Sequence, residues 1–131
     1  MGVPPLVWDY TLAAYANKYA ANQDTPDAGC SGALRHSGGP YGENLYWYWN
    51  SNRVRATPSQ AVGSWVSERQ YYNYKANACA GGHECGHYTQ VTWAKTRRVG
   101  CVARACTSNP LATYVICSYY PPGNYIGQRP Y

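Results

Sequence analysis

The sequence of 131 residues contains no phenylalanine and one methionine, but fifteen tyrosines and five tryptophans. An aromatic core must therefore use rings that carry an OH or NH group, and such rings need hydrogen-bond partners when buried. A run of eighteen apolar residues is also absent, which argues against a membrane-spanning helix. Residues 1–5 lack the charged and apolar segments of a secretory signal, so we expect a secreted form to be mature or to carry an added Met1.

The net charge of the chain does not identify a class of binding partner. Eleven basic residues against six acidic ones leave a net charge of +5, which simple solubility explains, with an acidic partner or a membrane surface as the alternative. Basic runs with interleaved aromatic residues are missing, so we expect no nucleic-acid partner. The length suits one domain over residues 1–131.

The six cysteines are an even number in a small domain, which favours three disulfides and an oxidising compartment. The alternative is a structural zinc site. Cys79 and Cys85 are six positions apart and Cys101 and Cys106 are five apart, and neither pair has the C-x-x-C spacing of most such sites. The sequence alone leaves the pairing of the cysteines open.

Two helices are predicted. Apolar residues recur at helical spacing over residues 10–21, and Asp9 precedes them as an N-cap. The second helix begins at the sequence Thr-Pro-Ser-Gln (57–60), which has the pattern of a capping box with proline at the first helical position. Its apolar stripe comprises Ala61, Val62, Trp65, Val66 and Tyr72.

Glu68 lies on the apolar side of this second helix, close to the angular position of Ala61. A carboxylate there must find a partner or shift its pKa. The alternative is that Glu68 lies at the edge of the stripe and reaches water.

Strands are predicted over residues 98–106 and 112–120, and the second is expected to be central. Residues 88–95 fit either a short helix or a strand. The tail over residues 121–131 begins with two prolines and should be extended and irregular.

The segment His36–Asn44 reads HSGGPYGEN. Its density of glycine and proline predicts an irregular loop, and loops of this kind often hold functional side chains. We therefore expect His36 and Glu43 to be carried on a shaped loop.

His83–His87 matches the zinc-peptidase motif H-E-x-x-H, which requires a helix that places both histidines on one face. Glycines at positions 81, 82 and 86 oppose a helix here, and we expect Cys85 to bond to Cys79. The motif therefore does not predict a metallopeptidase.

Four motifs together resemble the CAP superfamily, and within it the plant pathogenesis-related proteins of group 1. They are HSGGPYGEN (36–44), the helix with Trp65 and Glu68, CGHYTQVTW (85–93) and CSYYPPGNYIGQRP (117–130). The resemblance covers nearly the whole chain. It implies an α+β fold, a three-layer α-β-α sandwich with a central antiparallel sheet.

The resemblance further implies a cleft formed by His36, Glu43, Glu68 and His87. In the family the two histidines hold a divalent metal, often zinc, with the acids nearby, and this donor set suits Zn²⁺. The alternative is a hydrogen-bonded tetrad that needs no cofactor. His83 and Glu84 lie outside the family motif, so we expect them on the surface.

Disulfide pairing also follows from the resemblance: Cys30 with Cys106, Cys79 with Cys85, and Cys101 with Cys117. Relatives begin with a further helix that this sequence lacks. Its loss should expose apolar surface, which would destabilise the domain or favour a dimer. We expect a monomer, with a dimer as the alternative.

In function, the resemblance implies a secreted defence protein of the plant apoplast that binds sterol or another lipid, with a pathogen membrane or effector as a further partner. Tyr41, Tyr46 and Trp49 have the spacing of the aromatic sterol-binding loop of relatives. In a chain that is 15% aromatic, core packing is the alternative explanation.

Two other functions remain open. Relatives release their tail as a signalling peptide, here residues 121–131, by cleavage between Tyr120 and Pro121, although Ser118 replaces the asparagine of the family site. The second open function is a metal-dependent hydrolase built on the cleft residues, in which a metal-bound water is the nucleophile. We expect a binding protein and no enzyme.

Overall fold

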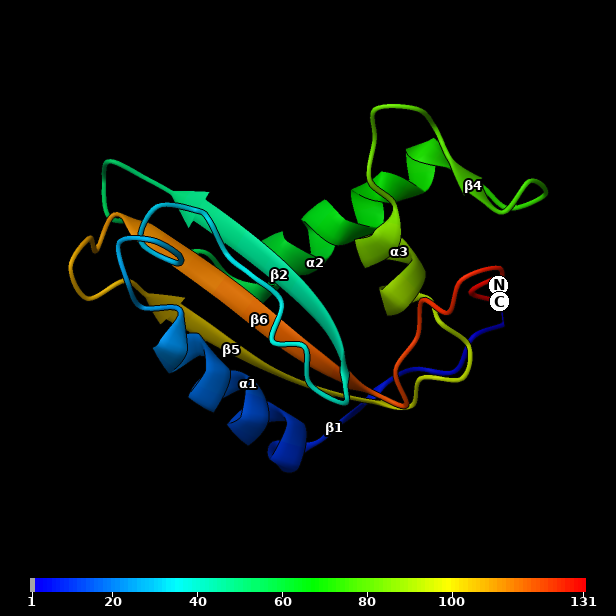
Figure 1. Ribbon diagram of the computed structural model, residues 1–131, viewed down its shortest axis with the longest axis horizontal. Coiled ribbons are helices and arrows are strands. Elements are labelled where there is room, and N and C mark those ends of the chain that lie inside the picture. The colour runs from blue at the N-terminus through cyan, green and yellow to red at the C-terminus, as the bar shows by residue number, and fades with distance from the viewer. Residues whose placement is uncertain (1) are drawn as a thin grey trace.

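A four-stranded sheet forms the middle layer of the protein in the computed structural model, which describes residues 2–131 (Figure 1). The strand order is β1-β5-β6-β2. The bounds are β1 Val7–Trp8, β2 Gly42–Trp49, β5 Arg98–Ala105 and β6 Ala112–Tyr120. Strand β6 is central and is buried along almost its whole length, as predicted.

The sheet is mixed, so the prediction of an antiparallel sheet is wrong at one edge. Strands β2 and β5 both run antiparallel to β6, but the two-residue β1 is parallel to β5. Most of the chain separates β1 from β5, so no hairpin dictates their relative direction.

Helix α1 (Tyr10–Asn22) covers one face of the sheet (Figure 1). Asp9 caps it as predicted, since its carboxylate accepts hydrogen bonds from the backbone N–H groups of Thr11 and Leu12. Ala16 and Ala20 of the helix are fully buried against the side chains of β6 that point to this face.

Helices α2 (Pro58–Ser67) and α3 (Gly86–Val91) cover the other face and complete the predicted α-β-α sandwich (Figure 1). The capping box of Thr57 and Gln60 is present, and the ambiguous segment 88–95 begins within α3. The predicted apolar stripe is wrong in part, because Val62 and Val66 are 41% and 40% exposed.

The stripe also fails at its last residue, Tyr72, because the second helix is shorter than its pattern. A 3-10 helix, η1 (Glu68–Tyr71), replaces it after Ser67, and Tyr72 belongs to the small hairpin of β3 (Tyr72–Asn73) and β4 (Ala78–Cys79). The 100° periodicity of an α-helix does not apply beyond that change. Ala61 and Trp65 alone form the buried side of α2.

Three disulfides staple the layers in the pairs that the family resemblance implied: Cys30–Cys106, Cys79–Cys85 and Cys101–Cys117. The described part of the chain contains no free cysteine. None of its helices has the length and apolarity needed to cross a membrane.

The aromatic rings of the core carry polar atoms, and these atoms have hydrogen-bond partners. The hydroxyl group of Tyr114 donates to the carbonyl oxygen of Ala20 over 2.7 Å, and the indole N–H of Trp65 donates to the carbonyl oxygen of Leu45 over 3.1 Å. Buried tyrosine and tryptophan rings therefore keep their polar atoms satisfied.

The tail over residues 121–131 has no regular helix or strand, as predicted, but it lies against the domain. The backbone N–H of Ala94 donates to Pro130, the hydroxyl groups of Tyr88 and Tyr131 lie 2.8 Å apart, and Arg129 donates to two carbonyl oxygens before β4.

Gly100 of β5 marks the closest approach of α1 to the sheet. A Cβ atom there would lie 2.1 Å from the backbone nitrogen of Ala13 and 2.5 Å from the carbonyl oxygen of Asp9. We expect Gly100→Ala to lower the free energy of unfolding by about 3 kcal/mol, measured by urea denaturation, because backbone atoms on both sides must move.

Gly63→Ala is the matched control, because a Cβ atom at this exposed position of α2 meets nothing within 4 Å. We expect that change to raise stability by about 0.5–1 kcal/mol through helix propensity. Equal effects of the two substitutions would contradict the packing described for α1.

Candidate functional site

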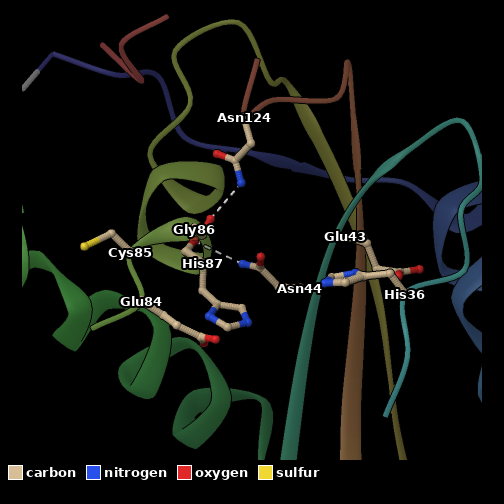
Figure 2. Close-up of a pocket in the computed structure, with 8 residues that line it drawn as sticks. All are labelled: His36, Glu43, Asn44, Glu84, Cys85, Gly86, His87 and Asn124. Carbon is tan, nitrogen blue, oxygen red and sulfur yellow. Dashed lines mark hydrogen bonds and ion pairs between the residues drawn. The ribbon is translucent and has the colours of Figure 1, made fainter. Parts of the chain in front are cut away.

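A cavity of about 320 Å³ opens between the start of β2, the start of α3 and the tail (Figure 2). The residues that line it are His36, Glu43, Asn44, Glu84, Cys85, Gly86, His87 and Asn124. We call this cavity the His–Glu cleft. Segments that are far apart in the sequence thus meet at one polar hollow.

The first pair in the cleft is His36 and Glu43. Glu43 lies in β2 and not on the predicted loop, because the irregular backbone ends at Tyr41 and the strand pairing with β6 begins at the next residue. The Nδ1 atom of His36 lies 2.9 Å from Oε1 of Glu43, which also accepts the backbone N–H of Ser37.

This pair shifts the pKa of both members. The hydrogen bond to Glu43 raises the pKa of His36 above its ordinary 6.5, although burial acts in the opposite direction. Burial would raise the pKa of Glu43, but the hydrogen bonds from His36 and Ser37 outweigh it and bring the value below the ordinary 4.5. The pair is therefore ionic in weakly acidic solution.

The second pair is His87 of α3 and Glu68 of η1, whose Nδ1 and Oε1 atoms lie 2.5 Å apart. The other oxygen of Glu68 accepts the backbone N–H of Tyr88 over 3.0 Å. The Glu68 side chain is only 14% exposed, so it faces inward to a partner as predicted, although it lies in η1 and not in α2. Trp65 stacks on the imidazole ring of His87.

Each histidine thus uses Nδ1 to contact a carboxylate, which leaves its Nε2 atom uncommitted. A carboxylate bonded to one ring nitrogen orients the ring and makes the other nitrogen a better metal ligand. The arrangement is the usual support for imidazole ligands of a divalent ion, and it equally suits a ligand that offers hydrogen-bond donors or acceptors.

Sequence reasoning missed two polar residues of the cleft. Asn44 donates to the carbonyl oxygen of His87 and to the hydroxyl of Tyr119. Asn124 of the tail donates to the carbonyl oxygen of Gly86 (Figure 2). The only signal for Asn44 was its place next to Glu43, and no sequence pattern connected Asn124 to the cleft.

Glu84 was expected to be a surface residue without a role. It is exposed, but it lines the cleft, and Figure 2 shows its carboxylate beside the ring of His87. Ligand atoms of Glu68, Glu84 and His87 lie within 4.8 Å of one another, and His36 is not part of this group. The metal pair of His36 and His87 stays a prediction.

The H-E-x-x-H sequence does not form a peptidase site. His83 precedes α3, which begins at Gly86, so the two histidines of the motif are not on one helix. The ring of His83 instead stacks on Tyr71, with 3.6 Å between ring centroids.

The acidic residues of the chain are distributed unevenly. Asp9 and Asp24 are paired with Arg98 and Arg104, whereas the residues that line the cleft include neither lysine nor arginine. Every glutamate of the chain lies at the cleft: Glu43, Glu68 and Glu84. The buried Oε2 atom of Glu43 has no hydrogen-bond partner among the described residues.

The three aromatic residues of the predicted sterol loop do not share one surface. Tyr41 directly precedes β2 and Trp49 ends it, so about 25 Å of strand separates them. Tyr46 packs into the core beside α2, while Trp49 is 49% exposed.

The predicted cleavage site lies where the sheet ends. The carbonyl oxygen of Tyr120, at the bond to Pro121, accepts a hydrogen bond from the backbone N–H of Arg97. The carbonyl oxygen of Pro121 accepts another from the hydroxyl of Thr96. The peptide bond is thus held in the folded domain on both sides.

A disulfide-stapled α-β-α sandwich with paired histidines and glutamates at one cleft defines a class of secreted domains. Residues 1–119 match the family described as "CAP: Cysteine-rich secretory protein family", and the chain belongs to that family.

Its relatives include plant defence proteins. Over its whole length the chain is 50% identical to the pathogenesis-related protein PR-1 of Medicago truncatula, of which it covers 70%. It is likewise 46% identical to the pathogenesis-related protein PRMS of Zea mays, of which it covers 74%. The structure of BmVAL-1 superimposes with a TM-score of 0.75 at 29% identity, over 96% of this chain and 63% of that one. The chain thus belongs with the plant pathogenesis-related CAP proteins, and it spans 70% and 74% of the length of these two plant relatives.

The His36–Glu43 pair makes a prediction about pH. A lowered folded pKa makes the Glu43 contribution to stability complete above pH 4.5 and lost as the pH falls through the folded value. A raised folded pKa makes the His36 contribution complete below pH 6.5 and lost as the pH rises through the folded value.

We therefore expect the loss of unfolding free energy in Glu43→Gln to be largest between these two pH values and to shrink on either side. Urea denaturation of both proteins from about pH 3 to pH 9 measures it. A difference that stays constant across this range would contradict the pairing.

Proposed function

We propose that this protein is an extracellular plant defence protein of the apoplast that binds a sterol or a similar rigid lipid. The observation that carries the proposal is an apolar groove of about 310 Å³ on the α2 side of the sheet. Its lining is formed by Leu6, Trp8, Pro58, Val62, Val91, Val99, Cys101, Val102, Ala103, Cys117 and Tyr119. Ligand sites for small apolar molecules have this size and this kind of lining.

The lipid is placed in this groove and not on the aromatic residues of β2, because Tyr41 and Trp49 lie too far apart to contact one sterol ring system. Groove residues come from α2, α3 and three strands, so a rigid flat ligand would contact several elements at once. Disulfides and the secretory family support the extracellular setting.

We expect Val62→Asp to weaken cholesterol binding at least tenfold, because the ligand would have to desolvate a carboxylate in the groove. Radiolabelled cholesterol and filter retention measure it. Val66→Asp is the control, since Val66 lies on the same helix with almost the same exposure but outside the groove lining.

Trp49→Ala separates the two sites that have been considered. Unchanged binding in Trp49→Ala with lost binding in Val62→Asp supports the groove. Lost binding in Trp49→Ala alone would return the site to the aromatic residues of β2, and absent binding to the unaltered protein would overturn lipid binding altogether.

A second candidate function is the binding of a divalent cation in the His–Glu cleft. Imidazole and carboxylate groups are suitable donors, and the lack of lysine and arginine in the cleft lining and the unpartnered Oε2 of Glu43 favour a cation. His36, Glu43, Glu68 and His87 would surround it. A bound ion would supply Lewis acidity, which is what a hydrolase in this cleft would need.

We favour binding over catalysis. The cleft lining of the described chain contains no serine, and its one cysteine, Cys85, is joined to Cys79. Release of residues 121–131 as a peptide is a further candidate that the contacts do not favour, since a protease would first have to detach both sides of the Tyr120–Pro121 bond.

A further inference from the structure

A further cavity, of about 330 Å³, opens at the end of the sheet where α1 and β2 begin and β6 ends (Figure 1). The residues that line it are Asp9, Thr11, Leu12, Tyr41, Arg98 and Tyr120. We call it the Arg98 cavity. None of these residues lines the His–Glu cleft or the apolar groove, so the cavity is a separate place on the molecule.

Two tyrosine rings form a corner at this cavity. The ring centroids of Tyr41 and Tyr120 lie 6.2 Å apart, and the ring planes meet at 82°. Tyr15 of α1 supports Tyr41, with 4.9 Å between ring centroids, whereas Tyr120 is 42% exposed. The face of an aromatic ring is electron-rich and attracts the C–H groups of a ligand ring. The corner therefore suits a saccharide unit, which carries C–H groups on its faces and polar groups around its rim.

Arg98 places a cation beside the corner. Its guanidinium carbon lies 5.1 Å from the ring centroid of Tyr120, and its Nη1 atom donates to Oδ2 of Asp9 over 3.0 Å. These contacts hold a side chain that is still 50% exposed. Its Nε and Nη2 atoms donate to no group within residues 2–131. Two adjacent N–H groups of this kind bind a carboxylate through parallel hydrogen bonds.

The chain next to Arg98 extends the positive charge beyond the cavity. Lys95 and Arg97 are exposed, so three of the eleven basic residues fall within four positions. Arg97 adjoins the cavity, because its backbone N–H donates to the carbonyl oxygen of Tyr120. Asp9 is the one acidic residue among those described in the lining. A row of cations beside a binding corner favours a ligand that carries negative charges at intervals.

We propose that the Arg98 cavity binds an acidic polysaccharide built of uronic-acid sugars. One sugar ring packs in the corner of Tyr41 and Tyr120, and its carboxylate accepts two hydrogen bonds from Arg98. The carboxylates of adjoining sugars lie along Arg97 and Lys95. A phosphate group would use the arginine without the rings, and an acidic peptide would use the charges without a saccharide ring for the corner, so the two tyrosines favour the saccharide.

Titration of the intact protein with an oligomer of galacturonate, measured by microscale thermophoresis, tests the charge. We expect Arg98→Gln to weaken binding about tenfold, the scale of one lost hydrogen-bonded charge. Arg55→Gln is the matched control, because it removes the same charge from an exposed position before α2. That control should change binding by less than about twofold, since salt screens distant charges.

The same titration of Tyr120→Leu tests the ring. We expect a loss of about fivefold, because leucine keeps the apolar contact but lacks the aromatic face. Tyr125→Leu is the control: Tyr125 is 53% exposed but lies on the tail outside the cavity lining, so binding should be unchanged. Equal losses in the two variants would contradict the tyrosine corner.

The ligand is varied to separate the chemical classes. The fully methyl-esterified oligomer keeps the rings and lacks the charges, whereas polyglutamate keeps the charges and lacks the rings. Each should bind about tenfold more weakly than the galacturonate oligomer. Polyglutamate that binds as tightly would overturn the saccharide in favour of an acidic peptide, and equally strong competition by inorganic phosphate would indicate a phosphate site instead.

Two further results would overturn the site itself: absence of binding to the unaltered protein, and equal losses in Arg98→Gln and Arg55→Gln. Folding is followed by the melting temperature. It should fall little in Arg98→Gln, because Asp9 still accepts its two hydrogen bonds from α1. If Arg98→Gln does not fold, Arg98→Lys keeps the charge but lacks the paired N–H groups and should still weaken binding. Binding of Arg98→Lys equal to that of the unaltered protein would contradict the two-bond contact.

Discussion

The contact between Glu68 and His87 is the interaction on which the site depends. It joins η1, directly after α2, to the start of α3, with 2.5 Å between Oε1 of Glu68 and Nδ1 of His87. The other oxygen of Glu68 accepts a hydrogen bond from the backbone N–H of Tyr88. A carboxylate that is only 14% exposed needs such partners, because burying a charged group without them costs free energy. The same contact fixes the imidazole ring that faces the cleft.

A hydrogen bond links the cleft to the apolar groove. Asn44 donates both to the backbone beside the ring of His87 and to the hydroxyl of Tyr119, and the ring of Tyr119 lines the groove. Burial raises the pKa of Tyr119 far above its ordinary value, so the hydroxyl remains a neutral hydrogen-bond partner. A ligand in the groove would therefore pack against a residue that is bonded to the cleft.

Much of the architecture could be predicted because local signals and the family resemblance agreed. The capping residues Asp9 and Thr57 marked both helix starts, and the apolar run over residues 112–120 marked the central strand. The parallel strand β1 could not be predicted from local patterns, since two residues carry no periodicity. The early end of α2 was missed because the apolar pattern runs on to Tyr72. Val62 and Val66 fit that pattern, but the fold leaves them exposed.

The residues of the site likewise fall into those that the sequence predicted and those that it did not. His36, Glu43, Glu68 and His87 were found through motifs, and Glu68 also through its place on a helix face. Asn44 and Asn124 were missed because their contacts are tertiary. Asn44 donates to the carbonyl oxygen of His87, and the tail brings Asn124 back to α3.

The central claim is that an acidic cleft built on the Glu68–His87 contact attracts a divalent cation. Anomalous diffraction from crystals soaked in Mn²⁺ tests it most directly. We predict one strong anomalous peak within coordination distance of the imidazole ring of His87. A cleft without a peak, in crystals where Mn²⁺ has reached other sites, would contradict it.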